Sequence, residues 1–103
     1  MGLIVEERKG AVMVWTLTRP DRLNALPDLE DGEAFASACE AANADPSIRC
    51  VVMTAAGGAF SAGGDIRWLH DCGKAGRHDD MLAFWGEEYI LNHRIKTYPK
   101  PYV

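Results

Sequence analysis

The spacing of hydrophobic and polar residues changes along this chain, and these changes indicate where its strands, helices and loops lie. Two short β-prone runs, residues 4–8 and 11–18, flank Lys9-Gly10, a pair typical of a hairpin turn. Residues 19–25 predict a loop, because proline cannot donate to a sheet ladder and aspartate and asparagine favour turns. The apolar, β-branched run of residues 48–55 predicts a third strand that is buried.

The segment between these strands predicts a helix that runs from Pro27-Asp28 to about Asn43. Asp28 can cap its first turn. Its inward stripe is expected to comprise Leu29, Phe35, Cys39 and Ala42. A strand–helix–strand order implies a right-handed crossover, so the second and third strands should pair in parallel.

Two further helices are expected before a final strand. A short one covers Asp65 to about Asp71, and residues 73–78 read as a polar linker. A long one follows to about Thr97, with Asp79-Asp80 as its cap. The side chains predicted to mark one side of it are Leu82, Trp85, Tyr89, Asn92 and Ile95 or Lys96. Tyr102-Val103 is typical of the first residues of another strand.

The amino-acid composition and charge argue against several classes of function. The chain has 103 residues, 48% hydrophobic and 25% charged, with a formal net charge of −4. No cluster of lysine and arginine supports nucleic-acid binding. No apolar run approaches the roughly 20 residues that span a bilayer, so no membrane partner is expected. Residues 1–8 lack the pattern of a signal peptide, which favours a cytoplasmic location.

Cysteine and histidine usage predicts neither a disulfide nor a metal site. Cys39, Cys50 and Cys72 are odd in number and widely spaced, which favours free thiols in a reducing compartment. The three histidines are too scattered for a metal site, and no His-x-x-x-His pair occurs.

The run Phe60-Ser61-Ala62-Gly63-Gly64-Asp65-Ile66-Arg67 carries the chemistry. A strand that leads through glycines into a helix can aim backbone N–H groups at a negative charge on a carbonyl oxygen. No register supplies the Gly-x-Gly-x-x-Gly dinucleotide motif, and Gly64-Asp65 stands where a phosphate loop needs lysine and serine or threonine. The plain alternative is a strand-to-helix turn without function.

This octapeptide closely resembles the hallmark of the crotonase (enoyl-CoA hydratase/isomerase) superfamily. Three other segments match the family in the same order, namely residues 15–26, 45–52 and 100–103. The resemblance implies an α/β fold, the ββα spiral of the crotonases. It also implies that residues 1–103 are the N-terminal part of a single domain of that fold.

Within the superfamily, three segments resemble the 3-hydroxyisobutyryl-CoA hydrolases: Gly63-Gly64-Asp65-Ile66-Arg67 together with residues 87–93 and 98–103. Hydratases more often show Ala-Gly-Ala-Asp-Ile-Lys. The resemblance implies an acyl-CoA thioesterase of valine breakdown, without a metal or redox cofactor. The alternatives are an enoyl-CoA hydratase or isomerase, and a non-catalytic fragment that binds CoA.

The resemblance also implies the site residues. The N–H of Gly64 would be one oxyanion donor, and the second would come from a glycine-rich loop beyond Val103. Asp65 is expected to cap the short helix rather than act as a base. Arg22 and Arg67 could reach CoA phosphates or be solvated charges. The residues expected to contact acyl-CoA are Arg22, Leu23, Ala25, Ala62, Gly64, Asp65, Ile66 and Arg67. The expected partners are acyl-CoA and either further copies of the chain or a complementary C-terminal portion.

Overall fold

Three strands form one mixed sheet in the order β1-β2-β3. The computed structural model describes residues 4–24 and 29–103. β1 (Ile4–Lys9) and β2 (Val12–Leu17) form the expected antiparallel hairpin. β3 (Cys50–Ala55) pairs with β2 in parallel, from Val12↔Cys50 to Leu17↔Ala55. The predicted hairpin and the predicted parallel pairing are both confirmed.

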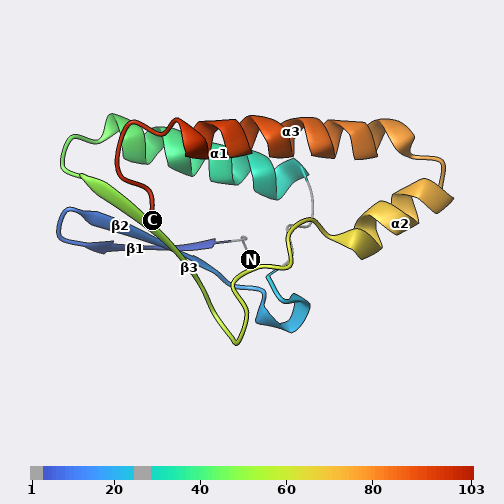
Figure 1. Cartoon of the computed structure of the whole chain (residues 1–103), viewed down its shortest axis with the longest axis horizontal. Helices are drawn as coiled ribbons and strands as arrows, with labels where there is room; N and C mark the ends of the chain where they lie inside the picture. Colours follow the sequence, from blue (N-terminus) through green and yellow to red (C-terminus); the bar gives the residue numbers. More distant parts are fainter. Residues whose placement is uncertain (1–3, 25–28) are drawn as a thin grey trace.

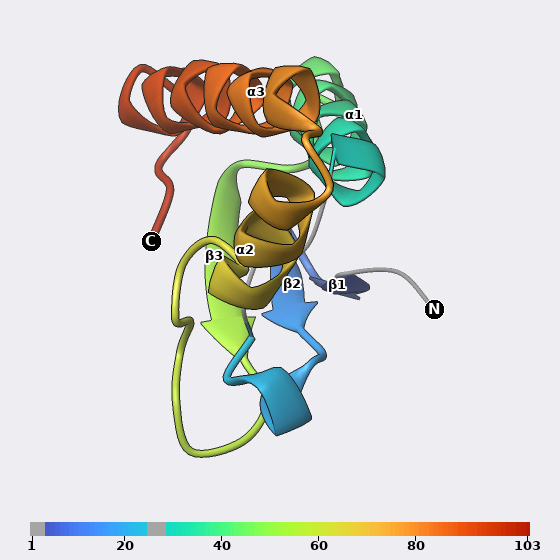
Figure 2. The ribbon, with the colours of Figure 1, turned by 90° about the vertical axis from the view of Figure 1, so that its right-hand side faces the viewer.

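Two helices cover one face of this sheet. α1 (Leu29–Ala44) and α3 (His78–Lys96) lie side by side above the strands, and α2 (Ile66–Lys74) extends away from the sheet toward the start of α3 (Figure 1). Figure 2 shows the same helix layer at the top, with α2 in front of the strands. The α/β architecture is therefore a sheet with its helices on one side, and the glycine-rich segment leads from β3 to α2.

The main core lies between the sheet and α1. Trp15 is fully buried, and its ring meets the ring of Phe35 edge to face at a centroid distance of 5.4 Å. Its indole N–H donates to the carboxylate of the exposed Glu6 at 3.0 Å, so this buried polar group keeps a hydrogen-bond partner. The remaining buried members of the cluster are Cys39, Ala42, Ile48 and Val51. Phe35, Cys39 and Ala42 confirm the predicted stripe of α1. The cap Asp28 and the side chain of Leu29 lie outside the described residues.

Only part of the side predicted for α3 packs on the protein: Ile95 contacts the core, whereas three other members of that side stay exposed. Leu82 and Tyr89 are 64% and 71% exposed, and Trp85 is 38% exposed. The helix is instead buried at Phe84, and it packs on the core near its end through Leu91 and Ile95. Apolar residues occur on more than one side of this helix, so their spacing alone could not select the side that packs.

The boundaries around α2 and α3 also differ from expectation. Gly73 and Lys74 belong to α2, so the linker is shorter than predicted. Arg77 occupies the N-cap position of α3 and makes no capping hydrogen bond. Asp80 accepts instead from the Arg77 guanidinium at 2.7 Å, so Asp79-Asp80 does not cap the helix. The two aspartates still lie in the first turn, where the helix dipole favours negative charge.

The end of the chain returns to the sheet as predicted. Tyr102 forms a parallel bridge with Val51, and the N–H of Val103 donates to the Val51 carbonyl at 2.9 Å. This segment therefore begins a fourth strand beside β3. Among the described residues, no helix combines the length and the apolar character that crossing a membrane requires.

Candidate functional site

A tight turn follows β2 and forms one half of the candidate site. Pro20–Arg22 make a short 3₁₀ turn, and the next two residues, Leu23 and Asn24, have positive φ values of 51° and 53°. The N–H of Asn24 donates to the Arg19 carbonyl at 2.8 Å, which closes the turn. Asparagine is one of the few residues that adopt this left-handed conformation readily, whereas leucine does so at a cost.

Asn24 ties this turn to the loop that follows β3. Its side chain is fully buried, and its amide nitrogen donates to the carbonyls of Ala56 and Ala59, each at 2.9 Å. Its side-chain oxygen accepts from the N–H of Arg19 at 2.8 Å. All of these groups belong to loops, so no sheet or helix could supply their partners. One side chain therefore fixes the spacing between two loops that are distant in sequence.

The glycine-rich loop forms the other half of the site. The Ser61 hydroxyl donates to the Asn24 carbonyl at 2.8 Å and accepts from the N–H of Gly63 at 3.0 Å. Gly63 has a φ of 85°, which a residue with a side chain rarely adopts. The loop then enters α2, where Asp65 accepts from the N–H of Trp68 at 3.1 Å. The predicted capping role of Asp65 is confirmed.

The structure brings the two expected CoA-contacting segments together. The N–H of Ala62 donates to the carbonyl of Leu23 at 2.8 Å, so residues from both segments lie side by side. The side chains of Leu23, Ile66 and Arg67 are exposed, and Asp65 is 8% exposed. Arg22 lies in the 3₁₀ turn, but its side chain and the whole of Ala25 lie outside the described residues. Contact of these residues with CoA stays a prediction.

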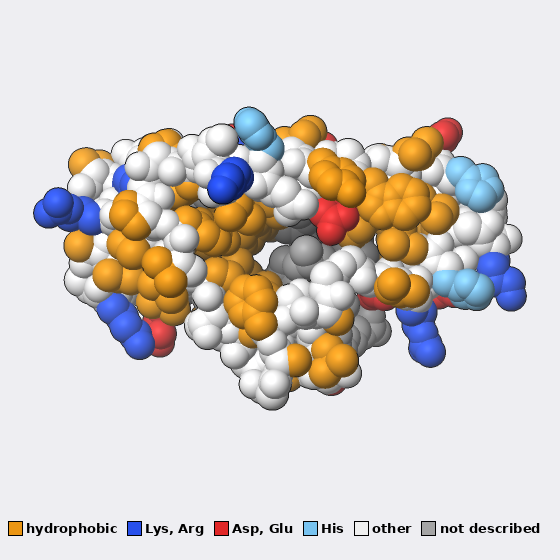
Figure 3. All heavy atoms as spheres, in the orientation of Figure 1, with side chains coloured by type: hydrophobic (Ala, Val, Ile, Leu, Met, Phe, Trp, Pro, Cys, Tyr) orange, Lys and Arg blue, Asp and Glu red, His pale blue; other side chains and the backbone are white. Residues whose placement is uncertain are grey.

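The space-filling view shows a hollow between the helix layer and the segment beneath it, with hydrophobic side chains along the wall toward the sheet (Figure 3).

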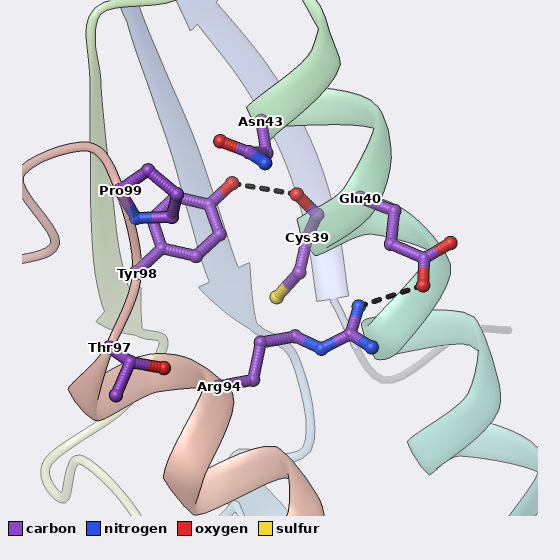
Figure 4. Close-up of a pocket in the computed structure, with 7 residues that line it drawn as sticks. All are labelled: Cys39, Glu40, Asn43, Arg94, Thr97, Tyr98 and Pro99. Carbon is purple, nitrogen blue, oxygen red and sulfur yellow. Dashed lines mark hydrogen bonds and ion pairs between the residues drawn. The ribbon is translucent and has the colours of Figure 1, made fainter.

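A second hollow lies at the other end of the helix layer (Figure 4). It measures about 160 Å³ and is lined by Cys39, Glu40, Asn43, Arg94, Thr97, Tyr98 and Pro99. Several of its polar groups are already engaged: Arg94 pairs with Glu40 at 2.9 Å, and the Tyr98 hydroxyl donates to the Cys39 carbonyl at 2.7 Å. Burial raises the pKa of the Cys39 thiol to about 11, which keeps it protonated at neutral pH. The thiol in this pocket is therefore a poor nucleophile and the Glu40 carboxylate is paired with Arg94, so the glycine-rich loop remains the candidate site.

The described residues hold no group of three or more histidine, cysteine, aspartate or glutamate side chains placed to bind a metal ion. All three cysteines are unbonded in the structure, as predicted.

Comparison with known proteins identifies the family. The profile of the enoyl-CoA hydratase/isomerase family matches residues 12–103. The chain belongs to this family, the crotonases. A curated relative, the mitochondrial 3-hydroxyisobutyryl-CoA hydrolase of Xenopus tropicalis, is 46% identical over 99 residues, which cover 93% of this chain and 25% of the relative. The chain therefore spans about a quarter of that hydrolase.

Solved structures of the family confirm the crotonase-like fold. An enoyl-CoA hydratase of Rhodobacter sphaeroides 2.4.1 superposes with a TM-score of 0.88 at 37% identity, over 98% of this chain and 30% of that one. A carnitinyl-CoA dehydratase of Mycobacterium thermoresistibile gives a TM-score of 0.88 at 35% identity, over 97% and 29% of the two chains. The hydrolase is named as mitochondrial, whereas we expected a cytoplasmic location, so the compartment stays a prediction.

Sequence reasoning missed two residues that shape this site. Asn24 was noted only as part of a turn, and Ser61 only as part of the motif. Asparagine before a small residue in a loop is a known turn signal, and a serine two positions before a glycine can bond its N–H. Those signals predict local turns. The link between two separate loops is visible only in three dimensions.

Replacement of Asn24 should destabilise the protein in a defined order. Asn24→Ala leaves two carbonyls and one N–H without their partner, which we expect to lower the free energy of unfolding by about 3 kcal/mol. Asn24→Asp should cost more, because it brings a carboxylate oxygen against two carbonyl oxygens. Asn24→Gly should cost less than Asn24→Ala, because glycine accepts the positive φ.

Urea unfolding of the three variants and the parent protein measures this order. A free energy of unfolding that Asn24→Ala and Asn24→Gly leave unchanged from the parent would show that the side-chain hydrogen bonds do not hold the two loops together.

Proposed function

We propose that the complete protein containing this chain hydrolyses an acyl-CoA thioester of the 3-hydroxyisobutyryl-CoA type, a step of valine breakdown. In this reaction water adds to the thioester carbonyl, the carbonyl oxygen becomes negative, and the C–S bond then breaks to release CoA as a thiol. The chain would form the N-terminal part of one crotonase-fold domain. Its identity to a curated hydrolase supports this proposal.

The adjacency of the two loops is the observation that carries the proposal. The Leu23–Ala62 hydrogen bond makes one continuous backbone surface from the turn and the glycine-rich loop. Gly64 follows directly, two residues before the start of α2. In the proposed mechanism its N–H donates to the thioester oxygen, and loss of one such donor typically raises a barrier by ~2.7–4 kcal/mol. A second donor would come from residues that follow Val103.

Binding of CoA is proposed to use the exposed side chains around these loops. Leu23 and Ile66 are 58% and 77% exposed, and they would cover the apolar parts of the ligand. Arg67 stands exposed in the first turn of α2, where its guanidinium could pair with a CoA phosphate. The chain needs no metal or redox group for hydrolysis, and the remaining acid–base residues would lie outside it.

An enoyl-CoA hydratase or isomerase is the second candidate. The structural match to a hydratase at 37% identity favours it, and hydration also places negative charge on the thioester oxygen. A role as a CoA-binding fragment without catalysis, completed by a C-terminal portion or by further copies of the chain, is the third.

Turnover of two substrates by the complete protein separates these functions. We expect rapid release of free thiol from 3-hydroxyisobutyryl-CoA and little hydration of crotonyl-CoA. Free thiol is followed with a disulfide dye, and hydration by loss of the conjugated enoyl absorbance. Rapid hydration without thiol release would refute the hydrolase and support the hydratase. Binding of CoA without either reaction would support the non-catalytic role.

Replacement of Arg67 tests the proposed phosphate contact. We expect Arg67→Ala to raise KM for the acyl-CoA about tenfold with kcat unchanged, because a charge-assisted hydrogen bond of ~1.4 kcal/mol contributes to binding alone. The effect should shrink at high salt. Arg49→Ala is the matched control, because Arg49 is an equally exposed arginine that precedes β3 at the opposite end of the strand from the site. Equal kinetics of the two variants would contradict the contact.

A further inference from the structure

A small cluster of side chains lies behind the glycine-rich loop and outside the main core. Phe84 of α3 is 5% exposed, and its ring lies 5.3 Å from the ring of Trp68 in α2, tilted by 51°. Neither residue belongs to the core that surrounds Trp15. The backbone of Trp68 is held in turn by Asp65, so the cluster connects α3 to the beginning of α2.

Gly64 lies directly against this cluster. A Cβ placed on Gly64 would approach Cε1 of Phe84 to 3.3 Å and Cζ to 3.6 Å. Carbon atoms prefer a separation of about 3.5–4.0 Å, so the first contact is too close unless the ring or the loop moves. Gly64 is not among the glycines with positive φ, so its backbone alone would accept alanine. Among the described residues, the Phe84 ring is therefore the neighbour that an added methyl group would displace.

This contact would restrain the loop from a second side. Ser61 and Ala62 fasten the loop to the turn around Asn24 by hydrogen bonds. Those bonds act before Gly64 in sequence, whereas the Phe84 ring lies against Gly64 itself, which also forms a β-bridge. An oxyanion donor must lie about 2.7–3.1 Å from the developing charge, so a shift of a few tenths of an ångström matters.

We propose that Phe84 is a positioning residue for thioester chemistry at this site, because its ring, supported by Trp68, fixes the backbone of Gly64 and the direction of its N–H. The proposal rests on the proposed role of Gly64 as an oxyanion donor. Phe84 touches neither substrate nor reacting atoms in this account. It acts only through Gly64.

A double-mutant cycle in the complete protein tests this coupling. Gly64→Ala should lower kcat about tenfold and change KM less than about twofold, because an interaction made in the transition state alone affects kcat. Phe84→Leu opens space for the added methyl group. In that background, Gly64→Ala should lower kcat about threefold or less. Non-additivity of this kind marks residues in direct contact.

Two further variants serve as a control for the cycle and as a substitute for Phe84→Leu. Tyr89→Leu is the matched control, because Tyr89 is an aromatic residue of the same helix and is 71% exposed. Gly64→Ala should lower kcat by the same factor with or without Tyr89→Leu. Phe84→Met keeps a similar volume with a flexible side chain, and it replaces Phe84→Leu in the cycle where the leucine variant does not fold.

The outcomes separate the two proposals. Equal losses of kcat for Gly64→Ala in the parent and Phe84→Leu backgrounds would overturn the positioning role, as would a rise in KM at constant kcat. Absence of thiol release by the parent protein would overturn the proposed hydrolase instead. In that case the double-mutant cycle is repeated with hydration of crotonyl-CoA as the measured reaction, because hydration also develops negative charge on the thioester oxygen. The change in kcat for hydration then decides the role of Phe84.

Discussion

The hydrogen bonds of Asn24 are the constraint on which the candidate site depends. Its side chain bonds one N–H and two carbonyls from loops that no strand or helix could satisfy, and it is fully buried. A buried polar group that bonds several loop atoms at once costs much to disrupt, because each atom would lose its partner away from water. These hydrogen bonds therefore fix the position of the turn after β2 relative to the loop after β3. The path of residues 60–64, which continue from this loop, is fixed with them.

The rest of the fold supports this junction from two sides. Parallel pairing of β2 with β3 brings the ends of both strands to the same edge of the sheet, which is where the turn and the loop begin. Helices α2 and α3 meet behind Gly64 through Trp68 and Phe84. The loop that could stabilise a thioester oxyanion thus lies between a hydrogen-bonded junction and an aromatic contact. Such preorganisation is what electrostatic stabilisation of a transition state requires.

The sequence predicted this arrangement as far as local signals allowed. The hairpin, the buried positions of α1 and the cap at Asp65 follow from patterns within a few residues of each other, and the parallel pairing follows from the strand–helix–strand order. All are confirmed. The side predicted for α3 is right only at Ile95, because Leu82, Trp85 and Tyr89 form an apolar stripe as regular as the one that contains Phe84. The roles of Asn24 and Phe84 depend on contacts between distant segments. No periodicity or motif in one sequence carries that information.

The central claim is that the N–H of Gly64 points to the oxygen of a bound acyl-CoA. NMR of the complete protein labelled with ¹⁵N-glycine tests it directly, with an acyl-CoA analogue in which a methylene group replaces the sulfur and the carbonyl is kept. We predict that the Gly64 amide proton moves downfield and exchanges more slowly when the analogue binds, while Gly86 on the exposed side of α3 stays unchanged. Saturable binding with an unchanged Gly64 amide would contradict the account.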